Sequence, residues 1–140
     1  HQRITNTVAS YVRRTLEQFQ SSAEPNVTKQ HVFWRATSFD QTAKRNAWKK
    51  KILWQHYMKW AQMCFDAVQE QCQAVRNKNC WKRRPDISIT HDAYLKVAQL
   101  EDFYIEKDII MVDEAQDMTP CQASLFWGPT QRQGKLTYLF

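Results

Sequence analysis

A chain of 140 residues with 43% hydrophobic and 13% aromatic residues is long and apolar enough for one modest domain with a core, which excludes a compositionally disordered chain. Only two glycines are present, and this scarcity favours helices over a turn-rich β architecture. The net charge of +6 is uneven, because residues 41–84 carry 11 Lys or Arg whereas residues 85–117 carry 9 Asp or Glu; the basic block suits a polyanionic partner, and a solvated helix face explains it equally well.

The N-terminal half is expected to be helical. Apolar residues at helical spacing predict a helix over residues 4–20, which Ser21, Ser22 and Pro25 end. The short β-prone segment 31–34 is a weak candidate for a strand. Residues 42–76 contain neither Pro nor Gly and carry an apolar stripe, which predicts one long helix or two stacked helices.

The second half combines helices with strands. Thr90 is a suitable N-cap for a helix that runs to Leu100, after a basic connector over residues 77–85. The apolar run Ile109–Val112 has charge on both sides, which predicts a strand buried on both faces, as in a parallel sheet. We therefore expect an α/β, mostly helical fold.

A second strand is expected at the end of the chain. Residues 120–127 can form a helix that Gly128 and Pro129 end, and residues 136–140 have the composition of a strand. This order predicts a strand parallel to the run at 109–112, with a right-handed helical crossover between them.

The predicted strand 109–112 ends in two adjacent carboxylates, Asp113 and Glu114. In parallel α/β sheets, ligands bind at the carboxyl ends of the strands. The first carboxylate can hold Mg²⁺, and the second can orient or deprotonate a water that attacks a γ-phosphate. An acidic turn after a core strand, without catalytic function, is the alternative interpretation.

The pentapeptide DEAQD at residues 113–117 resembles motif II, the Walker B element, of UvrD/Rep-type superfamily-1 helicases. The segments 89–100 and 119–120 are similar to the F-box DNA helicases of that superfamily, with Ala93 where those proteins usually have glycine. The resemblance implies an ATP-driven, nuclear DNA helicase with ATP and Mg²⁺ as cofactors, 3′-to-5′ movement on single-stranded DNA and a role in recombination control.

The same resemblance assigns roles to four residues. Asp113 would be the Mg²⁺ ligand and Glu114 the catalytic base. Gln116 and Asp117 would couple the nucleotide site to neighbouring motifs and to the DNA path.

The sequence lacks a Walker A motif, G-x-x-x-x-G-K-[ST]. The nearest match runs from Gly128 to Leu136, with five residues between its glycines and leucine at the hydroxyl position. By the resemblance, we expect a fragment of the first motor domain that is inactive alone. Residues 1–88 would be a helical, basic, insertion-like region, and residues 89–140 a partial motor core that ends before motif III.

The basic block is the candidate DNA interface, since cations and tryptophan faces can meet phosphates and bases. For Trp48 and Trp54 a place in the core is the favoured interpretation. The candidate DNA-binding residues are Lys44, Arg45, Lys49, Lys50, Lys51, Lys82, Arg83 and Arg84.

The expected partners are single-stranded or duplex DNA and the remainder of the helicase chain, with a ubiquitin-ligase adaptor if an F-box is attached. No apolar run approaches transmembrane length, so no membrane partner is expected. The four cysteines form no C-x-x-C pair, which argues against a zinc site and for reduced, buried thiols. The alternative function is a non-catalytic, basic, helical nucleic-acid-binding module in which DEAQD is a relic turn.

Overall fold

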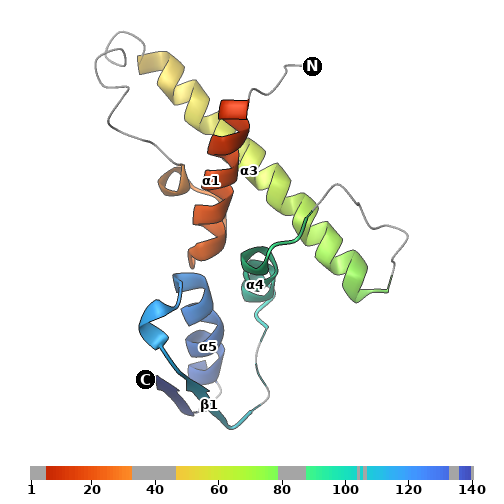
Figure 1. Cartoon of the computed structure of the whole chain (residues 1–140), viewed down its shortest axis with the longest axis vertical. Coiled ribbons are helices and arrows are strands. Elements are labelled where there is room, and N and C mark those ends of the chain that lie inside the picture. The colour runs from red at the N-terminus through yellow and green to blue at the C-terminus, as the bar shows by residue number, and fades with distance from the viewer. Residues whose placement is uncertain are drawn as a thin grey trace. The chain divides into compact units, whose positions relative to one another are not determined.

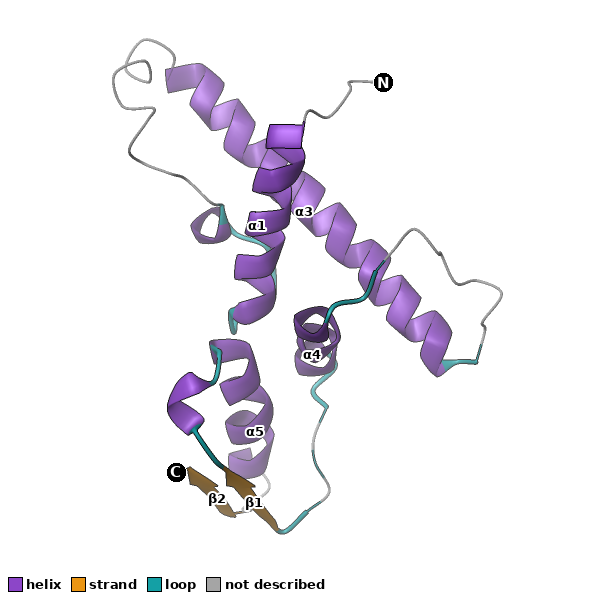
Figure 2. Ribbon diagram, in the orientation of Figure 1, coloured by secondary structure: helices purple, strands orange, loops and turns teal. Residues whose placement is uncertain are grey.

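The computed structural model describes residues 6–32, 47–78, 88–103, 105, 107–132 and 136–139. For some of these residues the structure describes only the backbone. They are Thr7 and residues 47–53, 128–132 and 136–139. Figure 1 follows the chain by colour, and Figure 2 distinguishes its helices from its strands.

The chain forms two compact units, which are considered separately. The first combines His1–Phe19 with Asn26–Ala67, and the second combines Gln20–Pro25 with Val68–Phe140. These bounds differ from the division at residue 88 that the sequence suggested. That division separates an insertion-like region from a motor core, and it stays a prediction.

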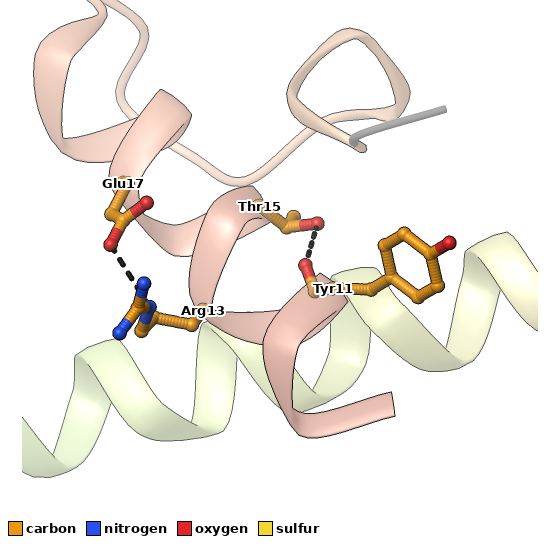
Figure 3. A network of polar contacts seen from close by, with 4 residues as sticks. All are labelled: Tyr11, Arg13, Thr15 and Glu17. Atoms are coloured by element: carbon orange, nitrogen blue, oxygen red, sulfur yellow. Dashed lines mark hydrogen bonds and ion pairs between the residues drawn. The ribbon is translucent and has the colours of Figure 1, made fainter. Parts of the chain in front are cut away.

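Helix α1 (Asn6–Ser21) has the amphipathic pattern that its sequence predicts. Its buried side includes Val12, Thr15 and Phe19. The Thr15 hydroxyl donates to the Tyr11 carbonyl at 2.8 Å, which satisfies this buried polar group inside the helix (Figure 3). On the exposed side, Arg13 and Glu17 form an ion pair of 3.2 Å across one turn (Figure 3).

Helix α3 (Ala47–Arg76) is one continuous helix of 30 residues, which decides between the two alternatives for this segment. Residues 42–46 of the expected helix lie outside the described part of the chain. In the first unit α3 meets α1 through aromatic edges: Phe65 contacts Phe19 with ring centroids 5.1 Å apart, and Tyr57 contacts Tyr11 at 5.8 Å. Such edge-to-face pairs contribute beyond the apolar area that they bury.

The expected strand at residues 31–34 is wrong at His31, which belongs to the short 3₁₀ helix η1 (Lys29–His31), and Val32 forms a bend. His31 is buried against Phe19, and its Nδ1 accepts the Thr28 backbone N–H at 2.9 Å. A local hydrogen bond and the burial of an aromatic ring thus outweigh the β propensity of this segment. The rest of it, from Phe33 onwards, lies outside the described residues.

In the second unit, helix α4 (His91–Leu100) has the expected bounds. The Thr90 hydroxyl accepts from the Ala93 N–H at 3.3 Å, which confirms Thr90 as the N-cap. At the other end, Phe103 N–H donates to the Ala98 carbonyl, and Asp102 adopts a left-handed conformation with φ of 50°. This is a Schellman motif with aspartate at the position that glycine usually occupies.

Strand β1 (Ile109–Val112) and strand β2 (Leu136–Leu139) pair in parallel, with Ile109 opposite Leu136 and Val112 opposite Leu139. Helix α5 (Pro120–Arg132) connects them and packs on α4 (Figure 2). The expected order of strand, helix and parallel strand is confirmed.

Two expectations about this βαβ unit are wrong. Helix α5 does not end at Gly128 and Pro129 but continues to Arg132. The fixed φ of proline is itself helical, although proline inside a helix removes one N–H donor and crowds the carbonyl one turn earlier. Strand β1 is not buried on both faces: Ile110 is buried, whereas Ile109 and Met111 are 57% and 70% exposed. Among the described residues the sheet has two strands, so one of its faces meets solvent.

Lys96 of α4 is completely buried. Its ammonium donates to the carbonyls of Ser22 and Glu24 at 2.9 and 2.5 Å and to Oε1 of Gln99 at 2.7 Å, while Gln99 Nε2 donates to the Ala23 carbonyl. Lys96 and Gln99 therefore attach the segment 20–25 to α4, because these donors satisfy carbonyls that follow the end of α1. Desolvation lowers the pKa of Lys96, although Cys121 and Glu24 act in the opposite direction.

The cysteines that the structure describes are free thiols in three different environments. Cys121 is buried, Cys72 is half-buried and Cys64 is exposed, so the expectation of a buried thiol is wrong for Cys64. Burial raises the pKa of the Cys72 and Cys121 thiols, which keeps them protonated at neutral pH.

Candidate functional site

The two carboxylates of the DEAQD segment lie directly after strand β1. Because β1 and β2 are parallel and Val112 pairs with Leu139, the carboxyl ends of the two strands lie at the same edge of the sheet. Asp113 is exposed there, and its Oδ1 accepts the backbone N–H of Glu114 at 2.9 Å. The second carboxylate oxygen of Asp113 has no hydrogen bond assigned to it within the described part of the chain.

Glu114 has an unusual backbone conformation, with φ of 53° and ψ of 41° in the left-handed region. Glutamate avoids this region unless its surroundings require it, and local strain of this kind is frequent at functional sites. Here the turn allows the Glu114 carbonyl to accept from Asp117 N–H at 2.9 Å, which opens the 3₁₀ helix η4 (Ala115–Asp117).

Gln116 holds the Glu114 side chain. Its Nε2 amide donates a hydrogen bond to the Glu114 carboxylate, and both side chains are exposed. The DEAQD turn thus brings together Asp113, Glu114 and Gln116, while Asp117 contributes its backbone N–H. The sequence indicated that the four residues are neighbours, but no spacing rule predicts the bond from Gln116 to Glu114.

The turn is anchored on the following helix by a capping box that sequence reasoning did not use. Thr119 Oγ1 accepts from Gln122 N–H at 3.3 Å, and Gln122 Oε1 accepts from Thr119 N–H at 2.8 Å. Pro120 occupies the first helical position, where its missing N–H costs nothing. The sequence T-P-x-Q carries this signal, since Ser or Thr three residues before Gln or Glu is the signature of a capping box.

The donor set at the β1 edge fits a cation that takes one or two carboxylates and completes its shell with water and phosphate oxygens, as Mg²⁺ does. Asp113 offers such a carboxylate, exposed and at a strand end. No cluster of three or more His, Cys, Asp or Glu that could enclose a metal occurs in the described ranges. Asp113 alone thus offers one carboxylate ligand at this edge, and the described residues add no further ligand cluster to it.

The predicted DNA-binding residues fall largely outside the description. Lys44, Arg45, Lys82, Arg83 and Arg84 belong to segments that the structure does not describe. For the lysines at positions 49–51 the backbone forms the first turns of α3, and their side chains are not described.

The described part of α3 has aromatic residues beside cations. Trp54 is half-buried, and Lys29 Nζ lies 5.6 Å from the centroid of its ring. A cation at this distance over an indole ring is attracted by the ring's negative face. Trp54 thus lies at the border of the core that was expected to contain it, and the side chain of Trp48 is not described.

Within the described residues, no helix is both long and apolar enough to cross a membrane. Comparisons of the chain with protein-family models, with curated proteins and with solved structures found no match.

Proposed function

We propose that the chain contributes the motif II part of the ATP-hydrolysing site of a UvrD/Rep-type DNA helicase. The observation that carries this proposal is the DEAQD turn at the carboxyl end of a parallel strand, followed by a capped helix and a second parallel strand. In α/β proteins this edge of the sheet is where nucleotides bind. The similarity of residues 89–120 extends the proposal to the nuclear F-box DNA helicases.

Within this proposal the acidic residues have different tasks. Asp113 would hold Mg²⁺, and the bound ion would neutralise charge on the nucleotide phosphates. Glu114 accepts a proton from the attacking water, and the amide of Gln116 fixes the orientation of the Glu114 carboxylate. The hydrogen bond from Glu114 N–H to Asp113 in turn fixes the orientation of the Asp113 carboxylate.

The proposal requires a phosphate-binding loop from outside residues 1–140, because their sequence contains no Walker A motif. The purified chain is therefore expected to show no ATP turnover, whereas a protein that joins it to a Walker A loop hydrolyses ATP. Sequencing the reading frame on both sides and measuring ATP turnover of the encoded protein test this. A reading frame without a Walker A motif, or turnover by the 140-residue chain that Glu114→Gln abolishes, contradicts the proposal.

A non-catalytic nucleic-acid-binding module is the second candidate. The observation that favours it is the charge of residues 41–65, which include six Lys or Arg and neither Asp nor Glu. In this case the affinity for DNA falls steeply with salt concentration, because phosphate contacts release counterions. The triple replacement of Lys49, Lys50 and Lys51 by Ala is then expected to flatten this salt dependence. The two candidates differ in ATP turnover of the encoded protein, since both bind DNA.

A further inference from the structure

One outward side of α3 carries a stripe of unusual composition for a solvent-exposed helix. Its members follow the spacing i, i+3, i+4 and i+7, so they share one face of the helix. The opposite face packs in the core of the first unit through Tyr57, Ala61 and Phe65. The stripe consists of His56, Lys59, Trp60 and Met63, of which Met63 is 57% exposed, His56 and Lys59 are exposed and Trp60 is half-buried.

Within this stripe the two aromatic rings are stacked. The His56 and Trp60 centroids are 5.4 Å apart and their planes differ by 25°. Trp60 also meets the buried Tyr57 edge-on, with centroids 6.1 Å apart, and Tyr57 contacts Tyr11 of α1. The core therefore holds the indole in place, and the exposed imidazole lies beside it in an offset stack. Less rotamer entropy of the indole is then lost when a ligand binds.

The charge around the stripe selects the chemistry of its partner. Lys59 lies between His56 and Trp60 in the sequence and is itself a member of the stripe. Residues 41–65 contain no acidic residue, and the first one after them is Asp66, which accepts a hydrogen bond from Gln62. An aromatic surface that carries Lys59, in a segment whose sequence has six Lys or Arg and no acidic residue, suits an anionic polymer with planar groups.

We propose that this stripe is a stacking platform for single-stranded nucleic acid, in which a base stacks on the His56–Trp60 pair and Lys59 contacts the adjoining phosphate. The inference deepens the DNA-binding part of the proposed function and is independent of ATP hydrolysis. Binding of this kind is tolerant of sequence, because every base has a π-face.

The chain contains a matched control for the aromatic pair. His91 and Tyr94 of α4 also lie close together, with centroids 4.9 Å apart, and Tyr94 is 46% exposed. Their rings meet at 66° instead of stacking, and residues 85–117 around them carry 9 acidic residues. An aromatic pair in a repulsive field is not expected to bind a polyanion.

The test measures binding of the whole chain to two labelled strands by fluorescence anisotropy at several salt concentrations. One strand is an oligothymidylate of about ten nucleotides and the other an abasic strand of equal length, so that both carry the same phosphates. The wild-type chain is expected to prefer the strand with bases by about 5- to 140-fold, the range for one stacked base. His56→Ala and Trp60→Leu each remove most of this preference and leave the salt dependence unchanged.

Two further variants complete the design. Lys59→Gln lowers affinity for both strands and reduces the slope of log K against log salt by about 0.7, the value for one phosphate contact on a single strand. His91→Ala leaves both affinities as in wild type. Because Trp60 contacts Tyr57 in the core, circular dichroism is used to verify that Trp60→Leu is folded. His56 is exposed, so His56→Ala changes no core residue.

Equal binding of the two strands by the wild-type chain overturns the proposal and leaves the stripe as a surface for a protein partner. Equal losses from His56→Ala and His91→Ala also overturn it. Neither outcome affects the ATPase proposal, because the assay contains no nucleotide triphosphate. Conversely, base binding by the chain supports the stripe, and if the protein encoded by the complete reading frame then lacks ATPase activity, the motor proposal is contradicted while the stripe is not.

Discussion

Lys96→Met tests the attachment of the segment 20–25 to α4, because methionine keeps the length of the side chain and removes its ammonium. The substitution deletes three hydrogen bonds of 2.5–2.9 Å, to Ser22, Glu24 and Gln99. Bonds to a charged group contribute roughly 1.5–3 kcal/mol each, about 4.5–9 kcal/mol for the three together. Burial of the ammonium costs several kcal/mol, which the substitution recovers. The net loss in free energy of unfolding is expected to be about 2–4 kcal/mol.

The assay is urea unfolding followed by far-ultraviolet circular dichroism. With a slope of about 2 kcal/mol/M, the expected loss lowers the midpoint by roughly 1–2 M. Lys59→Met is the matched control, because Lys59 is an exposed helical lysine and its replacement changes the free energy by less than about 0.5 kcal/mol. A Lys96→Met midpoint as close to wild type as that of the control would refute the role given to the buried ammonium.

The pH dependence of the same comparison has a definite sign. Desolvation lowers the pKa of Lys96 below its ordinary value of 10.5. Between the lowered value and 10.5, the unfolded chain therefore binds more protons at this position than the folded chain does, and stability rises with pH. The free energy of unfolding of wild type relative to Lys96→Met should increase as the pH approaches 10.5. A decrease over this range would contradict the burial of a charged lysine.

Three further substitutions probe the fold by urea unfolding. Phe65→Ala removes a ring that is 1% exposed and packs on Phe19, so a loss of about 3–5 kcal/mol is expected, and a loss below about 1 kcal/mol would contradict the contact between α1 and α3. Thr90→Ala deletes the cap that accepts from Ala93 and should cost about 1 kcal/mol, whereas no change would show that the cap is unimportant. Asp102 has a left-handed conformation with φ of 50°, which glycine adopts without steric cost. Asp102→Gly should therefore raise the free energy of unfolding by roughly 0.5–1 kcal/mol, and a lower value would contradict the Schellman motif.

The elements that the sequence predicted are those with strong local signals. Residues 42–76 lack Pro and Gly and carry an apolar stripe, and α3 occupies 47–76 of this range. Thr90 combines a cap with a following amphipathic segment, and α4 begins at the next residue. The parallel pairing of β1 with β2 followed from the order of strand, helix and strand, which an antiparallel hairpin does not produce.

The features that the sequence did not predict depend on tertiary contacts. A lysine in an amphipathic helix is usually solvated, and the burial of Lys96 depends on the carbonyls of Ser22 and Glu24, more than 70 residues earlier in the chain. His31 forms a 3₁₀ turn because Phe19 covers its ring. The spacing of His56 and Trp60 is visible in the sequence, but their exposure depends on which side of α3 meets α1.

The candidate hydrolytic site was located by its residues, not by its geometry. Asp113 and Glu114 follow an apolar run, and this pattern alone predicts that they lie at the end of a strand, where β1 ends. The left-handed conformation of Glu114 is not encoded by its residue type, since glutamate disfavours it. The bond from Gln116 to Glu114 depends on that conformation and could not be predicted without it.

The most direct test of the proposed motor is Glu114→Gln in the protein that the complete reading frame encodes, with ATP binding and single-turnover hydrolysis measured on the same preparations. Glutamine preserves the size of the side chain and removes the base, so binding should stay near wild type while turnover falls by on the order of 10²–10⁴-fold. Glu70→Gln, at an exposed carboxylate of α3, should change neither quantity. Full turnover by Glu114→Gln would contradict the assignment of the DEAQD turn to ATP hydrolysis.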